Sequence, residues 1–299
     1  MEMHIPLVLF SFFLSVSSGI FFAQGLVTFR GLSSKKYQMV TVVAALVSMV
    51  VGGIAVFTHL QHWERIFNGF GHLSSPITIE LIGVVVFVVV LAAFFLIFFR
   101  TEDGISPRWS GWLGMIMGVL LMVIVGESYI LASTPVWNSN LWIVFLACTC
   151  VAIAGPVMII QGYFVKENTE QIVALGKKLS LIGILLLIVS VFACAIYMST
   201  LGDFGELGYY FDPTLPDVAM ADTAAATNVF TGDQAVVFWI AVVACGLVLP
   251  LVCIILMMKQ KKLKTVMILA IVALAGICCC AISFRIIFFL TAVHIFAVF

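Results

Sequence analysis

Residues 77–99 read ITIELIGVVVFVVVLAAFFLIFF, an apolar run in which Glu80 is the only charged residue. A run of about 20 apolar residues is long enough to cross a bilayer as a helix. In lipid a helix is favoured over an open strand, because it satisfies its backbone hydrogen bonds within the segment. This stretch therefore predicts a membrane-spanning helix.

The rest of the chain repeats this pattern. Of its 299 residues, 64% are hydrophobic and 9% are charged, which is typical of a membrane protein with several spans. We predict an all-α integral membrane protein with eight transmembrane helices in a single domain over residues 1–299. The spans are expected at Ile5–Phe29, Met39–Leu60, Ile77–Phe99, Trp112–Ser133, Leu141–Phe164, Leu179–Thr200, Ala235–Met258, and from Val266 to near the C-terminus.

Lysine and arginine indicate the orientation. Nearly all of the 14 lie in the first, third, fifth and seventh connectors, and Arg65 and Arg285 are the exceptions. Cytoplasmic connectors carry an excess of such residues. We therefore expect both termini on the outer (periplasmic) side.

Several classes of function are disfavoured. The net charge is zero, whereas a nucleic-acid partner requires a clustered basic surface. The eight cysteines all lie inside apolar runs, without the spacing of a disulfide framework or of a four-cysteine zinc or iron–sulfur site. The predicted spans carry no histidine at mid-depth. We therefore expect no metal site, haem or iron–sulfur cluster in this chain.

The ionisable residues gather at the outer face. The stretch FTHLQHWERIFNGFGHLSSPITIE, residues 57–80, holds three of the five histidines. Ionisable groups in or beside a span are costly and often mark a functional site. His59, Arg65 and Glu80 belong to this stretch, and Glu127 and Arg285 are expected at a similar depth.

Together with nearby aromatic residues, these groups could bind a flat ring that carries two oxygen functions and enters from the lipid. A quinol fits this description. His59 or Arg65 could donate a hydrogen bond to a ring oxygen, and Glu80 could accept a proton. The simpler alternative is that the charges hold helix ends together and that Arg65 only extends to the membrane surface.

Three segments resemble a known family: HIPLVLF (residues 4–10), HLQHWERIFNGFGHLSSPITIE (residues 59–80) and ISFRIIFFLTAVH (residues 282–294). They look like the membrane-anchor subunit of the dimethyl sulfoxide reductase family, which is related to the polysulfide reductase membrane subunits. The resemblance implies a subunit of a prokaryotic cytoplasmic (inner) membrane that oxidises menaquinol. It further implies that the electrons pass to an iron–sulfur subunit and then to a molybdopterin catalytic subunit.

The resemblance also implies which residues bind the quinol, by their position in these segments. They are His59, Arg65 and Glu80. At residue 61 the family often has glycine, and this chain departs from it. Further residues that could surround the ligand are Gln61, Trp63, Glu127, Tyr129 and Arg285.

Two other functions remain open. One is a secondary transporter, because Pro156 and Pro250 interrupt spans, although the charges lie on one side rather than at the midplane. The other is a purely structural anchor. The connector 201–234 contains six carboxylates and no lysine or arginine, and it is either a solvated outer loop, a lid or a docking surface for the iron–sulfur subunit.

Overall fold

The computed structural model describes residues 5–58, 72, 75–202 and 223–292. Within these ranges it contains helices and no strand, and eight helical segments are long and apolar enough to cross a membrane. This confirms the predicted fold class. The eight segments are α1 (Ile5–Phe29), α2 (Lys35–Phe57), α3 (Pro76–Arg100), α4 (Arg108–Glu127), α5 (Leu141–Val165), α6 (Thr169–Thr200), η3 with α8 (Val237–Lys259), and α9 (Leu263–Leu290).

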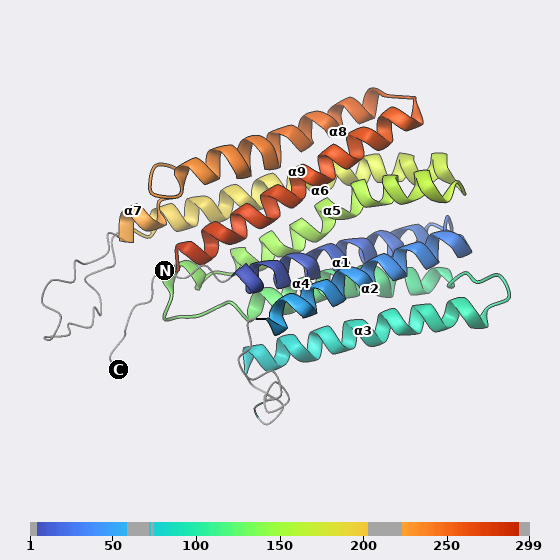
Figure 1. Cartoon of the computed structure of the whole chain (residues 1–299), viewed down its shortest axis with the longest axis horizontal. Coiled ribbons are helices and arrows are strands. Elements are labelled where there is room, and N and C mark those ends of the chain that lie inside the picture. Colours follow the sequence, from blue (N-terminus) through green and yellow to red (C-terminus); the bar gives the residue numbers. More distant parts are fainter. Residues whose placement is uncertain (1–4, 59–71, 73–74, 203–222, 293–299) are drawn as a thin grey trace, which may run out of the picture.

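The helices lie side by side and alternate in direction (Figure 1). Helices α1 and α5 are the most buried, with α2, α3 and α4 on one side and α6, α8 and α9 on the other. The start of α1 and the end of α9 share one end of the bundle, which we call the terminal end. The turns that join α1 to α2, α3 to α4, α5 to α6 and α8 to α9 lie at the opposite end (Figure 1), and we call it the basic end because most lysines and arginines lie there.

The helix boundaries differ most from the hydropathy pattern in two places. Helix α6 begins at Thr169, well before the expected Leu179, because its first turns are polar and extend past the apolar run. Helix α4 ends at Glu127 rather than Ser133. The apolar residues after Glu127 turn away from the helix, and a short 3-10 helix, η2 (Pro135–Trp137), follows.

Small residues allow the central helices to approach closely. A Cβ on Gly25 of α1 would lie 2.6 Å from the Gly111 carbonyl oxygen of α4. A Cβ on Gly155 of α5 would lie 2.4 Å from the Ser180 backbone nitrogen of α6. Neither position can take a side chain without moving a helix. Close packing through small residues is common in membrane bundles, where no hydrophobic force acts between the helices.

Pro156 and Pro250 have different effects on the spans that contain them. Pro156 lies inside α5, which continues on both sides of it. Pro250 follows a π-helix, η3 (Val237–Val248), and lies in the first turn of α8 (Leu249–Lys259). A Cβ on Gly276 of α9 would lie 2.5 Å from the Pro250 Cγ atom. Helix α9 therefore packs directly against the irregular part of the seventh span.

The described end of the long connector is compact. It forms the short helix α7 (Thr223–Thr227) and a turn in which the Asn228 side chain accepts hydrogen bonds from the Phe230 and Thr231 backbone nitrogens. The Val229 backbone nitrogen donates to Ser199 Oγ of α6 at 3.2 Å. Residues 223–234 are therefore packed onto the bundle.

Candidate functional site

Glu80 lies in α3 near the terminal end, close to where this helix begins. Its Oε2 atom is 2.8 Å from Ser128 Oγ, just beyond the end of α4. Its Oε1 atom is buried and has no hydrogen-bond partner among the residues that the structure describes. One turn further along α3, a Cβ on Gly83 would lie 2.9 Å from Ile124 Cγ2. The absence of a side chain there brings α3 close to α4 and places Glu80 beside Ser128.

The Ser128 hydroxyl faces two oxygen atoms, Glu80 Oε2 and the Val125 carbonyl, each at 2.8 Å. A hydroxyl carries one hydrogen and can donate to only one of them. The Tyr129 backbone nitrogen, which would serve Val125 in a continuing helix, instead donates to the Gly126 carbonyl. The Ser128 hydroxyl can therefore donate either to Glu80 Oε2 or to the Val125 carbonyl.

Tyr129 lies next in the chain, beyond the end of α4, and its side chain is buried. Burial raises the pKa of its phenol above the ordinary range, and the nearby Glu80 carboxylate raises that pKa further. Arg285 and a hydrogen bond with Ser11 of α1 act in the opposite direction and lower it. The phenol is therefore neutral at ordinary pH, and it lies between a carboxyl group and a guanidinium.

Arg285 of α9 is fully buried. Its Nε atom donates to Ser11 Oγ at 3.1 Å, and its two terminal nitrogens donate to Ser15 Oγ and to the Ala281 carbonyl oxygen. Its guanidinium also lies 5.5 Å from the centre of the Phe145 ring. Among the described residues it is thus held by hydroxyl groups, carbonyl oxygens and an aromatic face.

Aromatic rings surround Tyr129. Trp142 and Phe288 stack with their ring centres 3.6 Å apart, and Trp137 Nε1 donates to the Phe288 carbonyl at 3.0 Å. The rings that meet Tyr129 edge to face are those of Trp137, Trp142, Phe288 and Phe289. Trp142 Nε1 is buried and, within the described ranges, has no hydrogen-bond partner.

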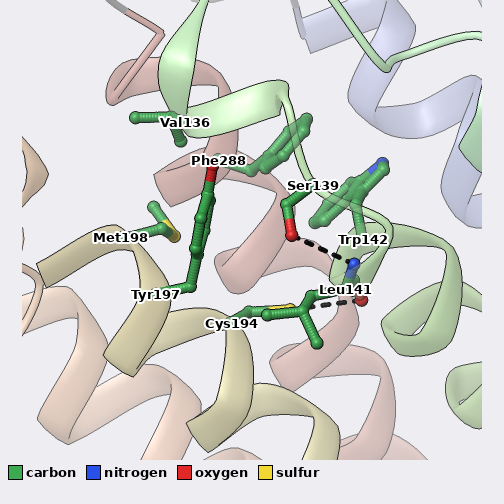
Figure 2. A pocket seen from close by; sticks show the side chains of 8 residues that line it. All are labelled: Val136, Ser139, Leu141, Trp142, Cys194, Tyr197, Met198 and Phe288. Carbon is green, nitrogen blue, oxygen red and sulfur yellow. Dashed lines mark hydrogen bonds between the residues drawn. The ribbon is translucent and has the colours of Figure 1, made fainter. Parts of the chain in front are cut away.

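A small cavity lies beside this cluster, between α5, α6 and α9 (Figure 2). Its volume is about 10 Å³, which is room for about one water molecule. The cavity is far too small for a quinol ring. The residues that line it are Val136, Ser139, Leu141, Trp142, Cys194, Tyr197, Met198 and Phe288.

The structure brings together Glu80, Tyr129 and Arg285 from three separate parts of the chain. Glu127, by contrast, is exposed on the last turn of α4. Four residues predicted to lie at the site, His59, Gln61, Trp63 and Arg65, are outside the described residues. Within the described ranges, no group of three or more histidine, cysteine, aspartate or glutamate residues is placed to hold a metal ion.

The sequence pattern did not indicate the three serines that bond to Glu80 and Arg285, which are Ser128, Ser11 and Ser15. Ser11 and Ser15 lie one turn apart in the first span, a spacing that places both on one helix face. That pattern could have indicated a polar partner in another helix. Ser128 carried no such signal, because its role depends on α4 ending at Glu127.

Comparison with protein families gives one match over nearly the whole chain. A family model described as polysulphide reductase, NrfD, matches residues 3–290. The chain belongs to the NrfD family. NrfD proteins are membrane subunits of polysulfide reductase and related reductase complexes, in which they pair with iron–sulfur and molybdenum-containing catalytic subunits. No curated protein matches the chain. The family match confirms the resemblance to the reductase membrane subunits, including the polysulfide reductase relatives.

Proposed function

We propose that this NrfD protein is the quinol-oxidising anchor of an anaerobic reductase in a prokaryotic cytoplasmic membrane. It binds menaquinol at the terminal end, which faces the periplasm. The electrons pass to an iron–sulfur subunit and then to a molybdopterin catalytic subunit. The observation that carries this proposal is the Glu80 carboxyl group, which is buried at that end with one oxygen free of any partner among the described residues.

Oxidation of menaquinol to menaquinone releases two electrons and two protons. The iron–sulfur subunit takes the electrons, and the protons leave to the periplasm. In its ionised form Glu80 accepts one proton from a quinol hydroxyl through Oε1. As a neutral acid beside Ser128 it then holds this proton, until the proton moves on to water. His59 and Arg65, from the connector just before α3, bind the ring oxygens.

Arg285 and Tyr129 complete this proposed site. Tyr129 offers a neutral phenol beside Glu80. Arg285 supplies a positive charge that, among the described residues, is balanced only by dipoles. A positive charge close to a buried ligand favours loss of a proton from that ligand. Arg285 therefore favours deprotonation of a quinol held next to it.

The test is Glu80→Gln in the assembled complex. Oxidation of a menaquinol analogue should fall about 100-fold, because the side chain no longer accepts a proton. Reduction of the terminal acceptor by an artificial dye should stay at the wild-type rate. Asp233→Asn is the matched control, since it removes an exposed carboxylate at the same end of the bundle and should leave both rates unchanged.

Four outcomes would contradict the proposal. Equal loss of quinol-driven and dye-driven activity would assign Glu80 to assembly. Normal quinol oxidation and normal quinone-analogue binding in Glu80→Gln would remove Glu80 from the site. Unchanged quinol oxidation in both His59→Ala and Arg65→Ala would remove the connector from it, and counterflow uptake by the isolated chain in liposomes would favour a transporter.

A further inference from the structure

A second surface feature lies at the basic end, which is the opposite end of the bundle from Glu80. It is a groove with a volume of about 260 Å³ between the end of α1 and the first turns of α6. Two of its lining residues are cations and the others are apolar or neutral. They are Arg30, Leu32, Gln171, Ala174, Leu175 and Lys178.

The wall formed by the α1–α2 turn is held in place by its neighbours. Asn168 Nδ2 donates to the Leu32 carbonyl at 3.0 Å, which ties this turn to the start of α6. Gly31 has a φ of 69°, a conformation that favours glycine. The Arg108 guanidinium lies against Gly31, where a Cβ would be 2.5 Å from it. Arg30 therefore projects from a fixed turn with a second cation beside it.

The floor of the groove is apolar. Leu32 and Leu175 both pack against a buried cluster that includes Val165 of α5 and Ile172 of α6. Helices α1 and α6 each pack against α5, which lies between them (Figure 1). Their ends are thus held apart, and the space between them remains open at the membrane surface.

One face of α6 continues from this groove along the bundle. Gln171, Leu175 and Lys178 follow a helical repeat that places them on one side of the helix. The same repeat continues to Ile182 and Val189, which are 54% and 68% exposed. The face is therefore cationic at the basic end and apolar beyond it.

We propose that this groove binds the phosphate headgroup of an anionic phospholipid whose acyl chains lie along α6. Arg30 and Lys178 bind the phosphate, and Leu32 and Leu175 contact the glycerol backbone and the upper acyl chain. Basic pockets between membrane helices bind anionic headgroups in this way. A free phosphate ion would match the cations but would leave the apolar floor and the exposed face of α6 unused.

The neighbouring charges agree with an anionic ligand. Glu170 lies one turn before Ala174 on α6, but it is not among the residues that line the groove. Lys177 donates to the Gln260 carbonyl at 2.8 Å and is directed toward the α8–α9 turn. The charges that line the groove are therefore those of Arg30 and Lys178.

The experiment measures lipid binding to the purified complex by native mass spectrometry. Delipidated complex is titrated with tetraoleoyl cardiolipin, with dioleoyl phosphatidylcholine and with inorganic phosphate. The variant Arg30→Gln/Lys178→Gln should lose at least about tenfold in cardiolipin affinity, since each cation contributes measurably to headgroup binding. The control Lys36→Gln/Lys264→Gln removes the same charge from exposed positions at the same end and should bind as the wild type does.

A second variant keeps both cations and fills the groove. Ala174→Trp should reduce cardiolipin binding, whereas Ala93→Trp, at an exposed position on α3, should not. Equal loss in the groove variants and their controls would overturn the proposal, because binding would then depend on overall charge or surface. Equal affinity for phosphatidylcholine, or competition by inorganic phosphate at the lipid concentration, would overturn it as well. Glu80→Gln should leave lipid binding intact, which separates this test from that of quinol oxidation.

Discussion

Gln38 near the basic end and Glu80 near the terminal end both bury polar atoms, but their hydrogen bonding differs. Near the basic end, Gln38 and Ser106 exchange two hydrogen bonds, one from Gln38 Nε2 to Ser106 Oγ at 2.6 Å and one from the Ser106 backbone nitrogen to Gln38 Oε1 at 3.0 Å. At the terminal end, Glu80 leaves one buried oxygen without a partner among the described residues. A neutral, reciprocal pair joins two segments of the chain, whereas a carboxyl group with one oxygen unpaired among the described residues is suited to bind a ligand.

The largest expected effect on stability is that of Gln38→Leu. This change keeps the size of the side chain but leaves the Ser106 nitrogen and hydroxyl buried without their partner. We expect a loss of about 2–4 kcal/mol in the free energy of unfolding, measured by denaturant titration in detergent. The folded fraction should oxidise quinol normally.

Gln171→Leu is the control for that change, since Gln171 is exposed on α6, and it should alter stability by less than about 0.5 kcal/mol. If Gln38→Leu were as stable as the control, the polar pairs of the basic end would not be holding helices together. The contrast between the two ends would then fail.

Arg285→Met should show the opposite behaviour. Stability should change by less than about 1 kcal/mol, because loss of the hydrogen bonds to Ser11 and Ser15 is offset by the end of a costly buried charge. Quinol oxidation should fall about tenfold, because a positive charge near the reacting group is removed. Stopped-flow oxidation of a menaquinol analogue measures the rate.

Arg100→Met removes an exposed arginine from the basic end and should leave the quinol rate unchanged. A large loss of stability in Arg285→Met with a normal rate per folded molecule would instead place Arg285 among the residues that join helices. The terminal end would then resemble the basic end.

The smallest effect is expected for Tyr129→Phe, which keeps the aromatic contacts and removes only the hydroxyl. Quinol oxidation should fall about threefold, the equivalent of one modest hydrogen bond. Burial raises the pKa of this phenol, so it remains protonated below its ordinary value of about 10. The pH profile of quinol oxidation from about pH 6 to about pH 9 should therefore have the same shape in both proteins. A step present only in the wild type would show that Tyr129 titrates.

Much of this fold follows from composition. The first span is bounded as predicted, because α1 contains no charged residue and Arg30 follows it directly. The early end of α4 could not be predicted from composition, because most residues directly after Glu127 are also apolar. Their turn depends on the packing of Tyr129 against rings of η2 and α9. Hydropathy reports transfer into lipid and does not distinguish a helix from a packed apolar turn.

The candidate site was predictable only in part. Glu80 and Arg285 could be identified because a charge inside an apolar run is unusual. Their arrangement around Tyr129 could not, because it depends on which helices become neighbours. The serine hydroxyls that hold Arg285 are ordinary residues in the sequence, and their role becomes clear only when α1 lies against α9.

That last contact has a consequence for how the chain is made. Ser11 and Ser15 are synthesised with α1, and Arg285 is synthesised later, with α9. An arginine is costly to insert alone, but hydrogen-bond partners that are already in the bilayer offset part of that cost. The contact between α1 and α9 can therefore form only after all eight spans have been synthesised, so it marks an assembled bundle.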